Sequence, residues 1–310
     1  MTETDTSSTR AFLTPPPEDF AAPRPPGPGA LVLFTVVFMM LQVIFMVLAA
    51  VLGRLFPFIP TAVILLAAGL VSTLLWGFAA WFWISVRALP RSWLRLSVPA
   101  VSGWFWPLLL LLVPVVVVFG SNLDMLVFHA FPGLNQPDAT LKSLTEATFA
   151  SPLAWVLVVG LAVVAAPICE ELFFRGVVFR SLRLRRWTFV PAMLFTSVLF
   201  AAIHLKLAGF FLLFMVAFVL AVLSERFTSL FPAILFHALY NAFVLMISLG
   251  AQWISGPEMQ PFSMTPPAQS AHGLPPLSVS LMLLALSGPA LAVLLSLIRR
   301  TVRPAPESNP

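Results

Sequence analysis

Eight long apolar segments constrain this 310-residue chain more than any other feature of its sequence. A transmembrane helix needs about 20 mostly apolar residues to cross the hydrocarbon core of a bilayer. Segments of about this kind lie at roughly 30–52, 59–86, 104–120, 153–182, 190–205, 207–224, 231–249 and 278–298. The pattern predicts an all-α, polytopic membrane protein with eight transmembrane helices.

Composition excludes the main alternative classes. Hydrophobic residues make up 60% of the chain and charged residues 9%, whereas soluble domains carry about 25% charged residues. Disorder requires low hydrophobicity, and a disulfide scaffold requires more than the single Cys169. We therefore expect the lipid bilayer as a partner and no nucleic acid, and we interpret the net charge of +5 as a topology signal.

The positions of Lys and Arg predict the orientation of the segments. If the N-terminus is cytoplasmic, the cytoplasmic segments hold 14 of the 17 basic residues. Basic residues favour the cytoplasmic side of a membrane protein, so we expect both termini in the cytoplasm. The cytoplasmic set is Arg10, Arg24, Arg87, Arg91, Arg95, Arg175, Arg180, Arg183, Arg185, Arg186, Arg226, Arg299, Arg300 and Arg303, and the outer set is Arg54, Lys142 and Lys206.

The ends of the chain predict two disordered tails around one membrane domain. Residues 1–29 contain seven Pro, a composition typical of a disordered, polyproline-like segment. We expect the membrane domain at 30–300, its catalytic core at about 150–250, and a second disordered tail at 301–310. The first apolar run, about 23 residues long, exceeds the core of a signal peptide. Fifteen Arg against two Lys suggest a bacterial source, so we expect a multi-pass protein of the inner (plasma) membrane.

Few ionisable or strongly polar side chains fall inside the predicted spans. We assign His129 and His272 to two long outer loops, at about 121–152 and 250–277. A charge inside the bilayer costs at least ~2.5–3.5 kcal/mol on insertion scales, so the side chains left in the spans are candidates for a functional site. They are Glu170, Glu171, Arg175, His204, His237 and Asn241.

Helical spacing separates the two glutamates. Glu171 and Arg175 are four residues apart with the acid first, the favoured order for an ion pair on a helix. Glu170 lies five residues before Arg175, about 140° away around the helix. We expect a structural Glu171–Arg175 pair and a Glu170 that is available for chemistry.

The same spacing groups the other polar residues. His237 and Asn241 share one helix face, as do Phe200 and His204. The fourth and fifth segments form a hairpin in which Glu170 and His204 differ in depth by only about 3 Å. We expect these two side chains to meet within the membrane, in a cavity open to the cytoplasm.

Three motifs follow one another on separate apolar segments. Residues 170–175 read EExxxR, residues 200–204 read FxxxH, and residues 237–241 read HxxxN. This ordered set resembles the CPBP intramembrane proteases, which include CAAX proteases, bacteriocin-processing enzymes and the type II CAAX prenyl endopeptidase. The resemblance covers roughly residues 150–250. It implies an eight-helix α fold that hydrolyses a peptide or membrane-protein substrate inside the membrane.

The resemblance also implies a role for each motif residue. By position, Glu170 and His204 would activate a water molecule, and His237 and Asn241 would stabilise the oxyanion. The remaining motif residues would support the site: Glu171, Arg175 and Phe200.

The family has been described both as metalloproteases and as glutamic proteases, and the residues bear on this choice. A zinc site takes three protein ligands and a water, which Glu170, His204 and His237 could supply. Only the paired Glu171 would then remain as a base, and the chain has no HExxH. Without a metal, Glu170 can act as general base while His237 and Asn241 donate to the oxyanion. We favour this cofactor-free scheme and keep zinc as the alternative.

Other interpretations stay open at the level of sequence. Intramembrane Glu and His also serve proton-coupled transporters, although we find no internal repeat of the kind many transporters have. A non-catalytic immunity or scaffold protein of the same family is a further alternative. Asn241 can simply join two helices, and Cys169 is more typical of a small buried hydrophobe than of a nucleophile. A prenylated substrate does not follow from the sequence.

Overall fold

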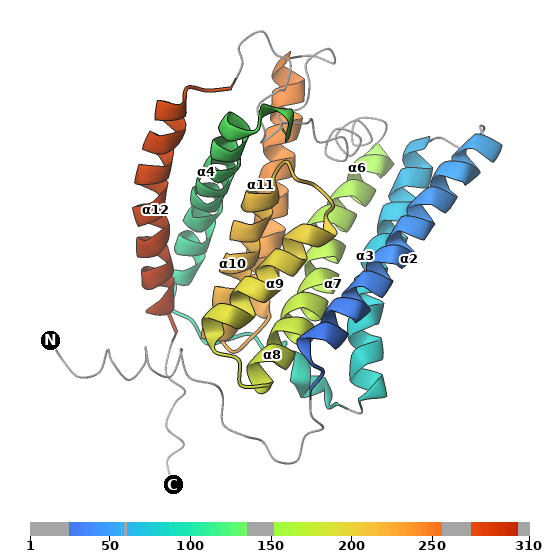
Figure 1. Cartoon of the computed structure of the whole chain (residues 1–310), viewed down its shortest axis with the longest axis horizontal. Coiled ribbons are helices and arrows are strands. Elements are labelled where there is room, and N and C mark those ends of the chain that lie inside the picture. Colours follow the sequence, from blue (N-terminus) through green and yellow to red (C-terminus); the bar gives the residue numbers. More distant parts are fainter. Residues whose placement is uncertain are drawn as a thin grey trace, which may run out of the picture.

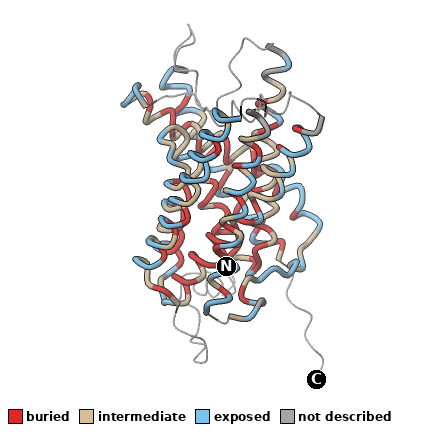
Figure 2. Tube along the Cα trace, turned by 90° about the vertical axis from the view of Figure 1, so that its right-hand side faces the viewer, coloured by how far each residue is buried: buried red, intermediate tan, exposed pale blue. Residues whose placement is uncertain are grey.

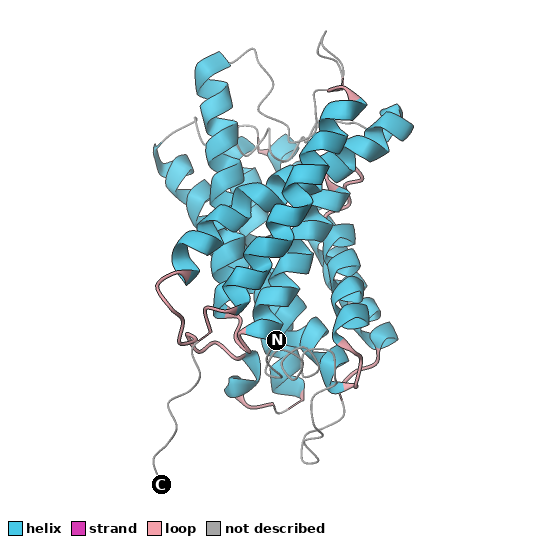
Figure 3. Cartoon of the chain, turned by 90° about the vertical axis from the view of Figure 1, so that its left-hand side faces the viewer, coloured by secondary structure: helices cyan, strands magenta, loops and turns pink. Residues whose placement is uncertain are grey.

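A computed structural model of the chain describes residues 25–56, 58, 61–87, 89–134, 152–255 and 274–302. Within these ranges the chain consists of helices and loops (Figure 3), apart from one isolated bridge between Val101 and Val302. The predicted all-α class is confirmed for the described residues. The predicted tails lie almost wholly outside the described residues, as does His272.

Within the described residues, eight helical rods follow one another in the order of the eight predicted segments. The fourth rod is continuous but contains two π-helical turns, η3 and η4, and short 3-10 turns lie at η1 and η2. The elements are α2 (Pro28–Leu55), α3 (Thr61–Val86), η1 (Arg91–Leu94), α4 (Phe105–Ala130), η2 (Pro132–Leu134), α6 (Pro152–Val159), η3 (Gly160–Ala165), α7 (Ala166–Phe173), η4 (Phe174–Phe179), α8 (Arg180–Leu184), α9 (Phe189–Ile203), α10 (Phe210–Arg226), α11 (Phe231–Ser255) and α12 (Leu277–Arg299).

Six helices of the described chain are long and apolar enough to cross a membrane. The other two, α9 and α10, have 15 and 17 residues, which at 1.5 Å per residue gives about 22 and 26 Å against a hydrocarbon core of about 30 Å. Figure 1 shows that the turn between α9 and α10 ends below the upper ends of α4, α11 and α12. The chain is thus built as a multi-pass membrane protein that encloses a short helical hairpin.

Aromatic side chains fill the centre of the bundle. The Trp76 ring lies 4.9 Å from that of Phe173 and 5.3 Å from that of Phe174, and Phe174 lies 5.1 Å from Phe200. These contacts join α3, the fourth rod and α9. Figure 2 shows buried residues along the inner faces of the helices. Many large apolar side chains remain exposed on the outside, among them Leu33, as expected of a surface that faces lipid.

The helix α4 corrects one prediction. We expected it to end near residue 120 and placed residues 121–130 in an outer loop, but it continues to Ala130. Asp124 is only 2% exposed, and its carboxylate accepts hydrogen bonds from the backbone N–H groups of Phe211 and Leu212, at 2.9 and 3.0 Å. Because this acid finds its partners inside the bundle, it does not end the helix. The assignment of His129 to the outer loop is therefore wrong as well.

The two ends of the helical bundle that are described lie on one side (Figure 1). Arg185 Nη1 donates to the carbonyl of Pro25 at 2.6 Å, just before α2 begins. After α12, Val302 forms the bridge to Val101 in the α3–α4 connection. An even number of helices places the two ends of the bundle on the same side. Which side of the membrane these ends face remains a prediction.

Candidate functional site

The two motif glutamates lie on α7, between the π-helical turns. A π-helical turn adds one residue to a helix and shifts the phase of the side chains that follow, and such turns are frequent at functional sites. Here one turn, η3, precedes α7 and the other, η4, follows it directly. Between them, the Glu171 side chain is fully buried, whereas that of Glu170 is 15% exposed.

The predicted ion pair between Glu171 and Arg175 is present. Arg175 Nη1 donates to Glu171 Oε1 at 2.8 Å, and both side chains are fully buried. Arg175 Nη2 donates to the carbonyl of Ala217 on α10 at 3.0 Å, and its guanidinium carbon lies 4.8 Å from the centre of the Phe200 ring. The pair therefore joins α7 to α10 and α9.

His237 lies between the two glutamates. Its Nδ1 is 3.0 Å from Glu171 Oε1, and because a carboxylate only accepts, Nδ1 carries the proton and donates. Its Nε2 is 3.9 Å from Glu170 Oε2, which is too long for a direct hydrogen bond but allows one water to bond to both atoms at about 2.8 Å. The structure thus brings Glu170, Glu171, Arg175 and His237 into one buried cluster.

His204 follows the last residue of α9 and lies against Phe200. Its Nδ1 donates to the Phe200 carbonyl at 2.9 Å, and the two rings are 5.0 Å apart. The Phe200 ring also lies 5.9 Å from that of His237, edge to face. The hairpin of α9 against the fourth rod is as expected. A direct approach of His204 to Glu170 remains a prediction.

Asn241 makes a contact that the spacing alone does not indicate. Its Nδ2 donates to the carbonyl of Ala162 at 2.7 Å, in the π-helical turn η3. The bond uses one of the two amide hydrogens and joins α11 to the fourth rod. It is the helix-joining contact that the sequence leaves open for this residue.

Throughout the ranges that the structure describes, no group of three or more His, Cys, Asp or Glu side chains is arranged to hold a metal ion. Glu171 Oε1 already accepts from Arg175 and His237, and His204 Nδ1 is bonded to the Phe200 carbonyl. A histidine that donates one ring N–H to a carbonyl or a carboxylate can still bind a metal through its other ring nitrogen, so the zinc alternative remains a prediction.

Sequence reasoning missed Asp124, another buried acid among the described residues. Its partners are the backbone of Phe211 and Leu212, far away along the chain. One signal was available. Residues 121–130 contain no Pro or Gly and stay largely apolar, as a continuing helix would.

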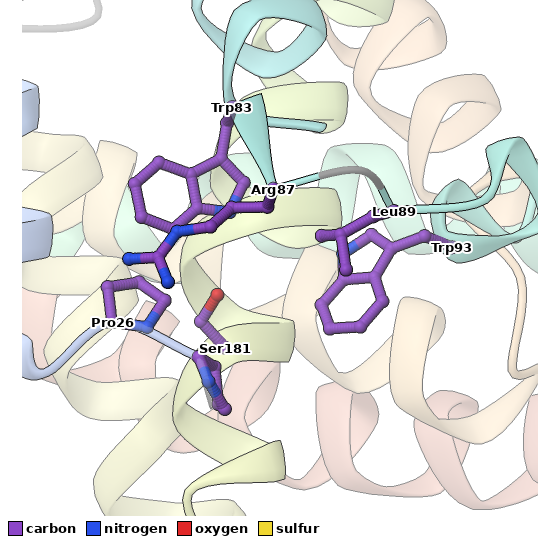
Figure 4. A pocket seen from close by; sticks show the side chains of 7 residues that line it. Pro26, Trp83, Arg87, Leu89, Trp93 and Ser181 are labelled. Atoms are coloured by element: carbon purple, nitrogen blue, oxygen red, sulfur yellow. The ribbon is translucent and has the colours of Figure 1, made fainter. Parts of the chain in front are cut away.

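Two hollows of the described surface lie away from the motif residues. Figure 4 shows a small one lined by Trp83, Arg87, Trp93 and Ser181, where the Arg87 guanidinium lies 5.0 Å from the Trp83 ring. The other is an apolar groove between α2 and α3. Neither leads to Glu170, so the predicted cavity towards the cytoplasm remains a prediction.

Comparison with known families agrees with the motifs. Residues 152–243 match the model of the family described as Type II CAAX prenyl endopeptidase Rce1-like. The matched segment begins with α6 and ends two residues after Asn241, so it contains all three motifs. Comparisons with curated proteins and with solved structures gave no match. Residues 152–243 are thus similar to the CAAX/CPBP protease family.

Proposed function

We propose that this protein is an intramembrane endopeptidase that hydrolyses a peptide bond with water activated by Glu170. The observation that carries the proposal is the gap of 3.9 Å between Glu170 Oε2 and His237 Nε2, beside the buried Glu171–Arg175 pair. Both residues lie on helices within residues 152–243, the segment that matches the family model. The gap is wide enough for one water that bonds to both groups.

Glu170 is the general base of the proposed reaction. It takes a proton from the water as the water oxygen bonds to the peptide carbonyl carbon. It returns that proton to the leaving nitrogen as the C–N bond breaks. His204 donates to the Phe200 carbonyl through Nδ1, and its Nε2 is the proposed holder of the water's second proton.

His237 and Asn241 are the proposed donors to the oxyanion. When His237 is protonated, Nδ1 donates to Glu171 and Nε2 is free to donate on the Glu170 side. When it is neutral with the proton on Nδ1, Nε2 accepts from water instead. Asn241 retains one amide hydrogen beyond its bond to Ala162. Each oxyanion donor contributes about 2.7–4 kcal/mol in known enzymes.

The test compares Glu170→Gln with the unchanged protein in a peptide-cleavage assay in detergent micelles. Glutamine keeps the shape but cannot take a proton, so cleavage should fall below detection while folding is retained. Glu225→Gln is the matched control, because Glu225 is also an ion-paired acid, 2.6 Å from Arg183, but outside the cluster. The control should retain cleavage. Full activity in Glu170→Gln would end the proposal.

Two further measurements address the substrate and the metal. Glu170→Gln should retain uncleaved substrate, which mass spectrometry of the co-purified peptides would identify. Metal analysis of the purified protein tests the zinc alternative. We expect no stoichiometric zinc, and zinc that disappears in His204→Ala would favour the metalloprotease scheme instead.

A further inference from the structure

Asp124 is a buried acid that the proposed chemistry does not use. It lies near the end of α4, is 2% exposed, and accepts from two successive backbone N–H groups, one through each carboxylate oxygen. These groups belong to Phe211 and Leu212 in the first turn of α10. The acid therefore caps a helix from a different part of the chain.

The position of this cap explains why an acid is needed there. The first N–H groups of a helix have no partner within the helix, and α10 has no side-chain cap of its own. The α9–α10 turn ends below the upper ends of α4, α11 and α12 (Figure 1), and an unpaired N–H group is costly at the depth of a membrane. A carboxylate satisfies two such groups and is favoured by the positive end of the helix dipole.

The helices α4 and α10 pack closely beside this contact. Gly120 lies one turn before Asp124, and a Cβ atom there would be 2.8 Å from the Cα of Leu212. Only glycine lets the two backbones approach so closely. Arg175 tethers the same helix further along, at the carbonyl of Ala217. Thus α10 is fixed at its first turn by Asp124 and near its middle by the motif arginine.

A short turn connects the anchored helix to His204. Only residues 205–209 separate His204 from α10. The turn is tightly bent, with positive φ angles at Leu205 and Gly209, and Leu213 N–H donates to the Gly209 carbonyl at 3.0 Å. Because the turn is short and bent, the position of one end restricts the position of the other.

We propose that Asp124 is a positioning residue for the reaction: by anchoring the first turn of α10, it holds His204 in place beside Phe200. The effect on catalysis rests on the proposed function, whereas the anchoring of His204 does not. Asp124 itself contacts no reacting atom. It acts through the α9–α10 turn.

The test uses Asp124→Ala with Asn122→Ala as the matched control. Asn122 is also a buried polar residue of α4, but its amide donates to its own helix, at the Val118 carbonyl. In peptide cleavage, Asp124→Ala should lower kcat by about 10- to 100-fold, as loss of supporting contacts does elsewhere, with little change in KM. Asp124→Asn should restore most of kcat, because an amide oxygen still accepts an N–H group.

A second readout does not depend on activity. Diethylpyrocarbonate modifies accessible histidines, and mass spectrometry compares His204 with His237 in the same molecule. Asp124→Ala should increase modification of His204 several-fold relative to His237, and the Asn122→Ala and Asp124→Asn variants should not. If Asp124→Ala does not fold, Asp124→Ser replaces it, because its short hydroxyl satisfies at most one N–H group.

The outcomes separate the two proposals. If the unchanged protein cleaves no peptide, the proposed protease function fails, and the labelling alone decides whether Asp124 anchors His204. Unchanged labelling of His204 in Asp124→Ala overturns the inference. So does an active Asp124→Ala enzyme with normal kcat, or an equal effect of Asn122→Ala.

Discussion

Glu170 and Glu171 are neighbours in the sequence but differ in surroundings. Glu171 is fully buried and bonded to Arg175 and His237, whereas Glu170 is partly exposed and faces His237 Nε2 across a gap. An acid that is fully buried and accepts from two side chains stabilises a fold. An acid that is partly exposed can exchange a proton with water. We therefore expect substitutions of the two acids to have separable effects.

Glu171→Gln should lower the free energy of unfolding by about 3–5 kcal/mol, because it leaves the buried Arg175 charge without its counter-ion. Glu170→Gln should leave stability nearly unchanged. Thermal unfolding in detergent micelles measures both. Replacing both partners, in Glu171→Leu with Arg175→Met, should recover much of the stability but not activity. If Glu171→Gln is as stable as the unchanged protein, the pair has no structural role.

Asn241→Ala separates a catalytic role from a structural one. Loss of its bond to the Ala162 carbonyl should cost about 1–3 kcal/mol of stability. Loss of an oxyanion donor should in addition lower kcat by about 10²–10³-fold. Kinetics at a temperature where the variant remains folded distinguish the two. A less stable variant with normal kcat would show that Asn241 only joins helices.

At the scale of single residues, the sequence predicts local partners and misses distant ones. The i,i+4 spacing was enough for Glu171 and Arg175, since one helix turn determines their distance. The bonds of Asp124 to α10 and of His237 to Glu171 depend on how helices pack. No spacing along the chain encodes those contacts. The motifs indicated that His237 belonged to the site, but not which acid it would bond.

At the scale of elements, the existence of each helix was predictable and the ends were less so. Hydropathy predicted an apolar segment at each helical rod of the described residues, because apolar runs of that length have few other uses. It failed for the last ten residues of α4, where Asp124 reads as a loop residue until its partners are known. The π-helical turns could not be predicted from the sequence either, because one extra residue in a helix does not change its composition.

The contact between α3 and α7 provides a test at this scale. A Cβ atom on Gly77 would lie 2.9 Å from Cys169 Sγ, so Gly77→Ala should cost about 1–3 kcal/mol through overpacking. Cys169→Ala alone should retain cleavage, and combined with Gly77→Ala it should restore part of the stability. Thermal unfolding measures the cycle.

Gly250→Ala is the control for this cycle, because nothing lies within 4 Å of a Cβ atom there. It should not destabilise, since alanine favours a helix more than glycine does. If Cys169→Ala fails to relieve Gly77→Ala, the crowding arises from some other contact. If Cys169→Ala abolishes cleavage in a folded protein, the thiol takes part in the reaction.

At the scale of the whole molecule, the basic residues predict orientation in a cell membrane. Both described ends lie on one side of the bundle, together with the Arg87 to Arg95 connection and Arg180 to Arg186. We propose that this is the cytoplasmic side, because basic residues favour it. The helical fold alone does not determine the orientation.

Labelling of single cysteines checks this orientation. In a Cys169→Ala background, a membrane-impermeant maleimide added to intact cells should label Gln260→Cys, in the predicted outer segment. It should label Ser7→Cys and Ser308→Cys only after the cells are opened. Labelling of either terminal variant in intact cells would show that this terminus lies outside the cytoplasm and would contradict the proposed topology.

The two π-helical turns have a consequence for comparing relatives. Each turn amounts to one inserted residue within a membrane helix, a place where alignments seldom allow a gap. A relative that lacks η3 or η4 would therefore be shifted by one position on one side of the motif. The EExxxR run begins on α7 and ends in η4, so its internal spacing crosses a turn boundary. Sequence alignments with relatives should therefore keep the two glutamates aligned and allow a one-residue gap on either side of the motif.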